Sequence, residues 1–302
     1  MSKDYNINYL QELESESIYI LREAAAEFKN PVLLYSIGKD SSVLLHLAKK
    51  AFYPDKIPFP LLHIDTGYKF KEMIEFRDYY TKKIGANLIV YKNEEPEAQK
   101  FSPKDAYTDS YIYYKKTKPL VEAIKKYNFD AAIGGARREE EKSRAKERIF
   151  SVRNETGAWD PKSQRPELWH LYNSRLSEGQ TIRVFPLSNW LEVDIWSYIL
   201  QEKLEIVPLY FSQRRKVIKR NKILIRVDEF NQPTETEEVI EVDCRYRTLG
   251  CSPSTGVILS TAKTVEEILE EVKQAKNSER ENRAIDNTSE TSMELKKREG
   301  YF

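Results

Sequence analysis

Apolar and polar positions along the first two thirds of the chain follow two periods, one typical of amphipathic helices and one of buried strands. Residues 10–28 and 42–51 each place apolar side chains on one helical face. Between them, residues 32–35 form a short continuous apolar run, as in a strand that is covered on both faces. The same pattern predicts strands at 61–64, 87–91, 130–133 and 182–185 and helices at 69–83, 118–128, 194–204 and 264–276. Strands that alternate with helices indicate crossover connections and a mostly parallel sheet.

This regular alternation ends after Gly135. Residues 136–148 are almost entirely charged, and residues 151–181 show little periodicity. We therefore expect an α/β domain over residues 1–210, followed by a smaller carboxy-terminal extension over residues 211–302. Because an open parallel sheet gathers its ligands at the carboxyl ends of its strands, the loops that follow the predicted strands are the first places to look for a site.

Composition narrows the class of protein. The chain has 302 residues with 49 basic and 48 acidic side chains, and this balance argues against binding nucleic acid through bulk charge. No apolar run reaches the ~18 residues of a membrane span, and no signal peptide is visible at the amino terminus. The two cysteines, Cys244 and Cys251, are too few for a disulfide framework or a four-cysteine zinc site. We expect a cytoplasmic protein without nucleic-acid or membrane partners.

The loop after the first predicted strand, residues 35–42, reads YSIGKDSS and precedes a predicted helix. Unpaired N–H groups and the positive end of the dipole make such a helix start a phosphate site. The groups available to an anion are Ser36, Gly38, Lys39, Ser41 and Ser42. On spacing alone, an ordinary capped strand–turn–helix remains equally open. The loop is neither a GxxxxGK[ST] P-loop nor a GxGxxG dinucleotide loop.

The form Ser-x-Gly-x-Asp-Ser resembles the pyrophosphate loop of the ATP pyrophosphatase superfamily, whose usual form has glycine where this chain has Ile37. The complete SIGKDS stretch is similar to the small catalytic subunits of heterodimeric bacterial sulfate adenylyltransferases. Further similar segments are HIDTG at 63–67, GGARREEEKSRAKERIFSVR at 134–153, RPELWHLYN at 165–173, RVFPLSNW at 183–190, RTLGC at 247–251 and SMELKKREGYF at 292–302. The resemblance covers nearly the whole chain and is weak at 93–117 and 212–244.

This resemblance implies a doubly wound, parallel-sheet fold of the adenine nucleotide alpha hydrolase (HUP) type. It also implies conversion of ATP and sulfate to adenosine 5′-phosphosulfate and pyrophosphate, with Mg²⁺ accompanying ATP and no tightly bound cofactor. The partner that the family implies is a GTP-hydrolysing large subunit, because forming the phosphosulfate anhydride is strongly uphill. The polar tail, residues 277–302, is a candidate contact for that subunit.

The resemblance also assigns site residues. Catalytic roles fall to Lys39, Arg137 and Arg138. ATP and pyrophosphate are expected against Ser36, Gly38, Lys39, Asp40, Ser41, Ser42, Asp65, Thr66, Gly67, Gly134 and Gly135. Sulfate is expected against Arg137, Arg138, Arg144, Arg148 and Arg247, and Mg²⁺ at Asp65 or Asp40. For Asp40 a plain helix cap is an equal alternative, and by composition alone the charged run at 136–148 is a solvated helix face.

Several other residues have plainer interpretations. His63 is expected to be a packed or hydrogen-bonded histidine rather than a base, and Cys251 a buried free thiol. Trp169 and His170 either stack on adenine or simply pack. Trp190, Trp196 and Tyr198 are expected in the core or at an interface rather than against a ligand.

Three rival functions remain open. A phosphoadenylyl-sulfate reductase relative would need a reactive cysteine near the carboxyl end, and no cysteine follows Cys251. A tRNA-modifying relative would need a nucleic-acid-binding module. A nucleotide sensor would bind ATP without turning it over.

Overall fold

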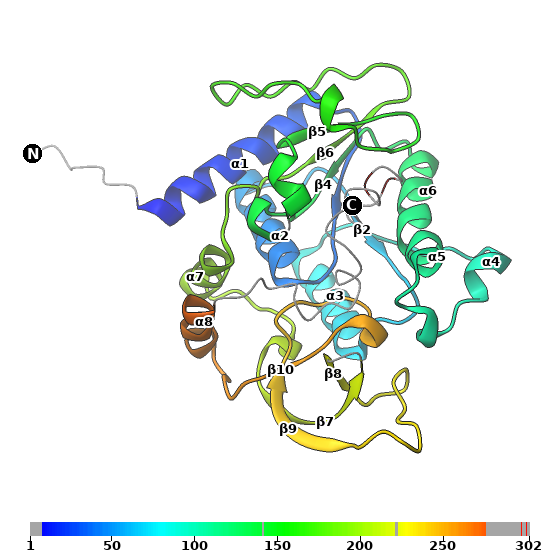
Figure 1. Cartoon of the computed structure of the whole chain (residues 1–302). Coiled ribbons are helices and arrows are strands. Elements are labelled where there is room, and N and C mark those ends of the chain that lie inside the picture. The colour runs from blue at the N-terminus through cyan, green and yellow to red at the C-terminus, as the bar shows by residue number, and fades with distance from the viewer. Residues whose placement is uncertain (1–7, 141, 221–222, 276–296, 298–299, 301–302) are drawn as a thin grey trace, which may run out of the picture.

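A six-stranded sheet in the order β3-β2-β1-β4-β6-β5 forms the centre of the molecule (Figure 1). Its strands are β1 (Pro31–Leu34), β2 (Leu61–Ile64), β3 (Leu88–Tyr91), β4 (Ala131–Ile133), β5 (Phe150–Arg153) and β6 (Thr181–Val184). All neighbours are parallel except β5, which runs antiparallel to β6. This computed structural model describes residues 8–140, 142–220, 223–275, 297 and 300.

Apolar residues cover the sheet on both faces. Successive residues of a strand point to opposite sides of the sheet, so neighbouring strand residues fall in different apolar clusters. Leu33 and Leu61 belong to the larger apolar cluster, whereas Val32 and Leu62 belong to a second cluster on the other face. The helices that contribute to the larger cluster are α1 (Tyr9–Glu27), α2 (Lys39–Phe52), α3 (Lys71–Ile84), α7 (Glu192–Glu202) and α8 (Val265–Gln274). The second cluster is closed by α6 (Lys118–Lys126). The predicted doubly wound α/β fold is confirmed.

The order of the strands reverses next to β1. From β1 the chain proceeds outward through β2 to β3, and it later returns to place β4 on the other side of β1. In doubly wound sheets, the loops that leave two such neighbouring strands diverge and open a crevice at the carboxyl edge. The loops after β1 and β4 therefore border the place where the fold itself leaves room for a ligand.

One helix and one strand of this domain differ from the sequence prediction. Helix α2 begins at Lys39, three residues before the predicted start at residue 42. Strand β5 falls in a segment for which little periodicity was expected. All four of its residues are buried, including Ser151 and Arg153, because Arg153 is paired with the buried carboxylate of Glu147. A charged residue inside a buried strand hides the apolar pattern on which the prediction depends.

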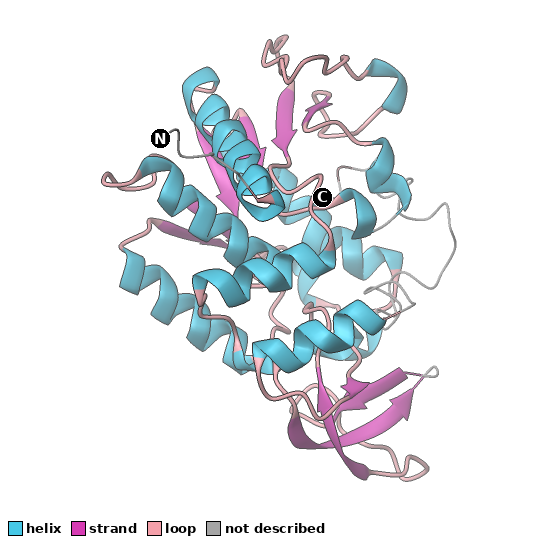
Figure 2. Cartoon of the chain, turned by 90° about the vertical axis from the view of Figure 1, so that its left-hand side faces the viewer, coloured by secondary structure: helices cyan, strands magenta, loops and turns pink. Residues whose placement is uncertain are grey.

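The remainder of the chain adds short helices and a second sheet. The short helices are α4 (Pro96–Gln99) and α5 (Asp109–Ile112). The second sheet is antiparallel, with the order β10-β9-β7-β8, and lies at one end of the molecule (Figures 1 and 2). Its strands are β7 (Gln213–Arg220), β8 (Ile223–Arg226), β9 (Ile240–Arg245) and β10 (Ile258–Leu259), and α8 (Val265–Gln274) follows and packs on α7.

The division at residue 210 stays a prediction. Val217 and Cys244 of the second sheet and Ile268 of α8 pack in the same apolar cluster as Leu33 of β1. The core therefore continues across the expected boundary. Among the helices in the described part of the chain, none combines the length and apolar composition that crossing a bilayer requires.

Most of the predicted partner-binding tail, residues 277–302, lies outside the described residues, but Lys297 is placed. Its side chain is 1% exposed, and its ammonium lies 2.7 Å from the carboxylate of Glu147. Its carbonyl accepts a hydrogen bond from the backbone N–H of Trp159 at 3.1 Å. Burial raises the pKa of Glu147, but Arg153 and Lys297 outweigh it and bring that pKa down to about 2. This end of the chain is thus tied to the segment that leads into β5.

We predict that Lys297→Met lowers the free energy of unfolding by about 3 kcal/mol, because it leaves a buried carboxylate with one cation fewer. Lys273→Met is the matched control, since its exposed pair with Glu270 is worth less than about 1 kcal/mol. Urea denaturation of both variants measures the difference. Equal small losses would show that the Lys297 pair does not stabilise the fold.

Candidate active site

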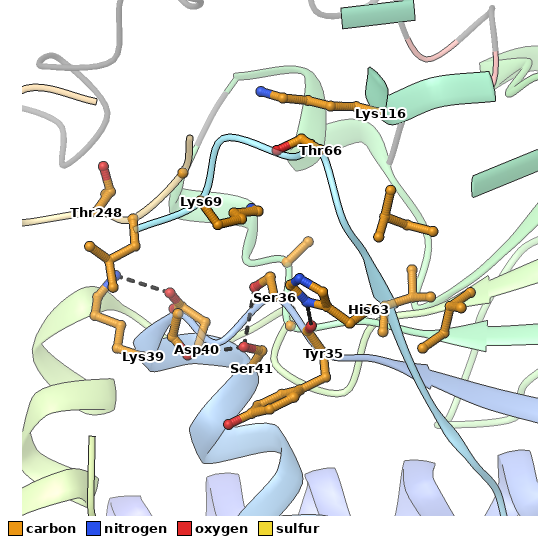
Figure 3. Close-up of a pocket in the computed structure, with 18 of the residues that line it drawn as sticks. Tyr35, Ser36, Lys39, Asp40, Ser41, His63, Thr66, Lys69, Lys116 and Thr248 are labelled. Carbon is orange, nitrogen blue, oxygen red and sulfur yellow. Dashed lines mark hydrogen bonds and ion pairs between the residues drawn. The ribbon is translucent and has the colours of Figure 1, made fainter. Parts of the chain in front are cut away.

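A cavity of about 260 Å³ opens at the carboxyl ends of β1, β2 and β4 (Figure 3). It is lined by Leu34, Tyr35, Ser36, Gly38, Lys39, Asp40, Ser41, Leu62, His63, Ile64, Thr66, Lys69, Lys116, Leu120, Gly135, Ala136, Glu140, Arg144, Tyr210, Thr248, Leu249 and Gly250. One part of the wall is apolar and comes from β1, β2 and α6. The polar lining comes mostly from the loops after β1, β2 and β4, with Lys116 from before α6, Tyr210 from after α7 and Thr248 from after β9. A molecule with an apolar ring and several negative charges would find a partner for each part here.

The loop after β1 brings its hydroxyls and the start of α2 into the cavity. The hydroxyl of Ser36 donates to Ser41 Oγ at 3.1 Å, and Ser41 donates in turn to the carbonyl of Gly38 at 3.0 Å. The backbone N–H of Lys39 donates to the Tyr210 hydroxyl at 2.7 Å. Gly38 is the N-cap of α2 and makes no side-chain cap, so the first turn directs N–H groups towards the cavity. This is the arrangement that suits an anion.

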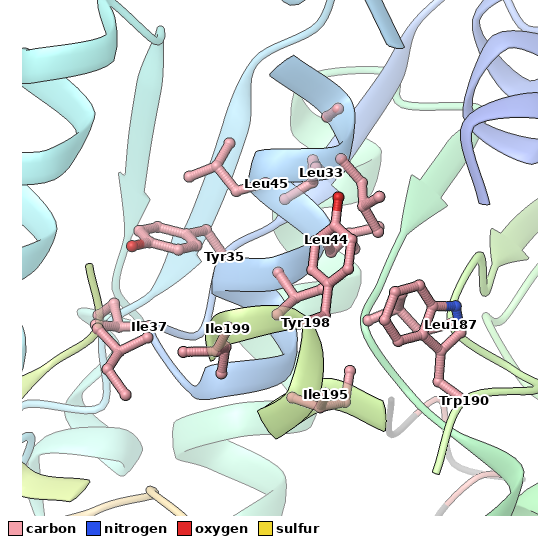
Figure 4. Packing of buried hydrophobic residues seen from close by; sticks show 14 of the residues in the cluster. Leu33, Tyr35, Ile37, Leu44, Leu45, Leu187, Trp190, Ile195, Tyr198 and Ile199 are labelled. Atoms are coloured by element: carbon pink, nitrogen blue, oxygen red, sulfur yellow. The ribbon is translucent and has the colours of Figure 1, made fainter. Parts of the chain in front are cut away.

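Ile37 carries the unusual backbone of this loop. Its φ is +69°, a left-handed conformation that is strained for a β-branched residue and easy for glycine. Because glycine adopts this φ without strain, the angle explains why the superfamily form has glycine at this position. In this chain the Ile37 side chain is fully buried and packs among the apolar residues around α2 and α7 (Figure 4). Burial of the side chain offsets the backbone strain and holds the loop in one shape.

Gly135, in the loop after β4, allows the close approach of two backbones. A Cβ atom at this position would lie 3.1 Å from the carbonyl carbon of Asp40 and 3.2 Å from the N atom of Ser41. Any side chain here would push against the first turn of α2. The glycine predicted from sequence therefore lines the cavity for a steric reason. The neighbouring Gly134 extends the sheet by donating its N–H to the carbonyl of Val184 at 2.8 Å.

Asp40 links the loops after β1 and β4. One carboxylate oxygen lies 3.0 Å from Lys39 Nζ, and the other accepts from Arg137 Nε at 2.6 Å. Arg137 also donates to Glu139 at 2.9 Å. Burial raises the pKa of Asp40, but Lys39 and Arg137 outweigh burial and hold it below its ordinary value. The helix-cap alternative for Asp40 is wrong, because the N-cap of α2 is Gly38.

The same network continues to α7. Glu139 accepts a hydrogen bond from the backbone N–H of Glu192 at 2.7 Å. The Glu192 carboxylate is bound by Arg247 at 2.7 and 3.2 Å. Burial raises the pKa of Glu192, whereas Lys39 and Arg247 lower it, and the net shift is downward. Arg137 and Arg247, two of the predicted sulfate ligands, are thus engaged by carboxylates and do not line the cavity.

The other three predicted arginines are distributed differently. Arg138 donates to Asn189 in an exposed contact, and Arg148 is exposed, so neither lines the cavity. Arg144 does line it, is 8% exposed, and lies 3.5 Å from Glu140. The charged run at 136–148 therefore folds as short 3₁₀ turns with both buried and exposed members, not as one solvated helix face.

The end of β2 contributes His63 and Thr66 to the cavity. His63 is 1% exposed, and its Nδ1 donates to the carbonyl of Tyr35 at 2.9 Å, which confirms a hydrogen-bonded histidine. Burial lowers its pKa and the charge of Lys69 adds to the shift, to about 4, so the ring is neutral near pH 7. Asp65 and Gly67 do not line the cavity, because Asp65 accepts the N–H of Gly67 at 2.8 Å within its own turn.

Cys251 is the buried free thiol that was predicted. Its Sγ lies 3.1 Å from the hydroxyl of Thr66. Burial raises the pKa of this thiol, but Lys116 and Lys69, with the hydrogen bond from Thr66, bring it down to about 7. The thiol therefore lies in a positive potential behind the wall of the cavity.

The remaining sequence candidates lie apart from the cavity. Trp169 is 83% exposed and does not line the cavity, so the structure supports neither of its two alternatives. His170 is also exposed. Trp190 and Tyr198 are in the core (Figure 4), and so is Trp196. Ser42 is buried and lies outside the lining.

Sequence reasoning missed several lining residues, namely Tyr35, Lys69, Lys116, Tyr210, Thr248, Leu249 and Gly250. Lys116 lies in a segment where the family resemblance is weak, Lys69 lies two residues beyond the HIDTG segment, and Tyr210 lies between matching segments. Thr248 and Gly250 belong to RTLGC, which was noted without a placement. A π-helical turn at Tyr113–Thr117 carries Lys116, and such turns are frequent at functional sites.

Comparisons with known proteins identify the family of this chain. Residues 30–257 match the family model described as phosphoadenosine phosphosulfate reductase domain. Proteins named sulfate adenylyltransferase subunit 2 from Aliivibrio fischeri and Shewanella pealeana are 58% and 56% identical over 297 residues, covering 98% of each chain. The chain belongs to the sulfate adenylyltransferase subunit 2 family. A solved structure of phosphoadenylyl-sulfate reductase from Candida auris matches with a TM-score of 0.47 and 18% identity, covering 68% of this chain and 91% of that one.

We predict that Gly135→Ala lowers the free energy of unfolding by about 1–3 kcal/mol, because the added methyl group overpacks the first turn of α2. Gly38→Ala is the control. Its φ of −69° suits any residue, and its Cβ would meet atoms at 3.5 and 3.6 Å, an ordinary contact. Urea denaturation compares the two. An equal loss in both variants would contradict the close approach at Gly135.

His63 predicts a pH dependence of stability. Its pKa is about 4 in the folded chain and about 6.5 when unfolded, so the unfolded state binds the extra proton. The free energy of unfolding should therefore fall as pH drops from about 6.5 to 4, by up to about 1.4 kcal/mol per pH unit from this group. His63→Asn should flatten that decline, whereas His170→Gln, at an exposed position, should not. Parallel slopes in all three proteins would contradict the assignment.

Proposed function

We propose that this chain is the catalytic subunit of a sulfate adenylyltransferase, which converts ATP and sulfate to adenosine 5′-phosphosulfate and pyrophosphate. The observation that carries the proposal is the cavity at the carboxyl edge of the sheet. There the hydroxyls of Ser36 and Ser41, the ammonium of Lys39 and the start of α2 converge beside an apolar slot. Membership in the family gives this cavity its chemical interpretation.

ATP would lie across the cavity in one direction. Its adenine would occupy the slot formed by Leu34, Leu62, Ile64 and Leu120. Its β and γ phosphates would lie on the loop, where the N–H groups of the first turn of α2 and Lys39 can stabilise the charge that develops as pyrophosphate leaves.

The bond changes need no proton transfer. An oxygen of sulfate forms a bond to the α phosphorus, the bond between that phosphorus and the bridging oxygen breaks, and its electron pair leaves with pyrophosphate. Sulfate is already a dianion at neutral pH, and pyrophosphate leaves as an anion stabilised by cations. The neutral, hydrogen-bonded His63 is consistent with a reaction that requires no general base. The work of the protein is positioning and electrostatic stabilisation.

Mg²⁺ is part of this proposal as the ion that accompanies ATP. In the described ranges, no three His, Cys, Asp or Glu side chains gather as a metal cage. The cavity does present the carboxylates of Asp40 and Glu140, which fits an ion held by one or two carboxylates and substrate phosphates. These two residues would hold Mg²⁺, which would supply positive charge to the phosphate oxygens. Asp65 is less suited, because it does not line the cavity.

A GTP-hydrolysing large subunit is the proposed partner, and the cytoplasm the proposed compartment. The name of the relatives, subunit 2, implies a second chain. Forming a phosphosulfate anhydride is strongly uphill, and this sequence contains no GxxxxGK[ST] motif with which to couple GTP hydrolysis. That coupling would come from a separate chain.

A thiol-dependent reductase is the rival that the matching family description raises, and the lowered pKa of Cys251 is the observation in its favour. Cys251 is fully buried and bound to Thr66, and the other cysteine, Cys244, is buried as well. A thiol that must attack a substrate needs access. The adenylyltransferase reaction uses no thiol and is therefore favoured.

The test is sulfate-dependent release of pyrophosphate from ATP and Mg²⁺, by the chain alone and with its large subunit and GTP. Adenosine 5′-phosphosulfate should appear as the product by mass spectrometry. Lys39→Met should lower kcat by about 100- to 1,000-fold, as loss of a donor to developing charge does. Lys49→Met, at an exposed position of the same helix, is the control. ATP binding without sulfate-dependent release, even with the partner, would contradict the proposal and favour a nucleotide sensor.

A further inference from the structure

The cations that the sequence suggested for sulfate are mostly not available to the cavity. Arg137 and Arg247 are bound by carboxylates, and Arg138 and Arg148 do not line the cavity. Four cationic side chains do line it, namely Lys39, Lys69, Lys116 and Arg144. Lys39 belongs to the phosphate loop and is tied to Asp40. The other three lie on different segments, which the fold brings to the same cavity.

We propose that Lys69, Lys116 and Arg144 form the subsite that binds the sulfate dianion. This proposal rests on the function proposed above and assigns its second substrate to residues of the cavity wall. Two of the three, Lys69 and Lys116, are residues that neither the sequence motifs nor the family resemblance indicated.

The position of the lysines fits the direction of attack. In Figure 3, Lys116 and Thr66 lie across the cavity from Lys39 and Ser41, and Lys69 lies between the two groups. An in-line displacement places the attacking oxygen and the leaving pyrophosphate on opposite sides of the phosphorus. If pyrophosphate leaves onto the loop after β1, sulfate must approach from the opposite wall, where the lysines lie.

The charge balance of the cavity also fits a dianion. Among the described residues, its lining contains four cationic side chains and the two carboxylates of Asp40 and Glu140, an excess of two positive charges. Asp40 is occupied by Lys39 and Arg137 on the side of the loop. The positive charge that these carboxylates do not offset is therefore concentrated away from the loop, on the wall assigned to sulfate.

The pKa values of two neighbouring groups, His63 and Cys251, are shifted by the positive charge at this wall. Beyond the effect of burial, Lys69 lowers the pKa of His63, and Lys116 and Lys69 lower that of the Cys251 thiol. Both shifts disfavour added positive charge or favour negative charge at the same place. They agree with the geometry in pointing to an anion there.

Arg144 adds a buried donor. Its side chain is 9% exposed, and its Nε has no hydrogen-bond partner in the described ranges of the chain. A buried donor left without a partner is costly, and its occupation by a ligand oxygen would relieve that cost. Its ion pair with Glu140, at 3.5 Å, is long enough to yield to a substrate.

The experiment compares Lys69→Met and Lys116→Met with the wild-type chain, in complex with its large subunit and GTP. Each substitution should raise the KM for sulfate by about ten- to a hundred-fold, the loss expected for one charge-assisted hydrogen bond. The affinity of the isolated chain for ATP, measured by calorimetry, should change by less than about threefold, because pyrophosphate binds at the loop. Lys116→Arg should retain most of the affinity for sulfate.

Lys71→Met is the matched control, since this lysine is two residues from Lys69, 81% exposed, and paired only loosely with Glu75 at 3.5 Å. Circular dichroism and the unfolding midpoint verify that each variant is folded. A fall in ATP affinity with an unchanged KM for sulfate would show that the lysines bind the triphosphate, and unchanged values for both substrates would remove them from the site. Either result overturns the subsite while leaving the adenylyltransferase function standing. If the wild-type complex showed no sulfate-dependent turnover, both proposals would be overturned. The wild-type assay is therefore done before any variant is made.

Discussion

The arrangement of the site depends on the two ion pairs that the carboxylate of Asp40 makes. It bridges Lys39 of the loop after β1 and Arg137 of the loop after β4, and it stands at the start of α2 where Gly135 lets the two backbones meet. A buried cation without a partner is costly, so each of these charges requires the other. The network therefore fixes both loops against each other before any substrate binds. Catalysis by positioning requires binding groups that are already held in place in this way.

The sequence predicted the central sheet well because the two patterns that determine it, apolar runs and amphipathic helices, are local. Short apolar runs between amphipathic helices predict parallel strands, and β1 to β4 and β6 lie within a residue or two of their predicted ranges. Strand β5 was not predicted, since Arg153 is buried by a pair with Glu147 that is formed only in the folded chain. The left-handed backbone at Ile37 could be suspected only from the glycine usual there, because isoleucine itself gives no sign of it.

The site was predicted where it depends on a motif and missed where it depends on the fold. Ser36, Gly38, Lys39 and Ser41 line the cavity, as their order in the loop indicated. The arginines were a poorer prediction, because a sequence shows that a guanidinium is present but not which carboxylate reaches it first. Arg137 and Arg247 are engaged in this way, by Asp40 and Glu192. Conversely, Lys116 enters the cavity through a π-helical turn that has no clear sequence signature.

This difference changes how the arginines of the site should be interpreted. Arg137 holds Asp40, and Asp40 holds Lys39, which lines the cavity, so removing Arg137 would disturb the loop after β1 even if Arg137 never touches a substrate. Residues of one network are not additive, and loss of activity alone does not identify a ligand. Lys69 and Lys116 come from segments other than the loops after β1 and β4, so a change in their charge can be tested against one substrate at a time. In the proposed assignment, Lys39 and Arg137 hold those two loops together through Asp40, while Lys69, Lys116 and Arg144 supply positive charge for a second anion.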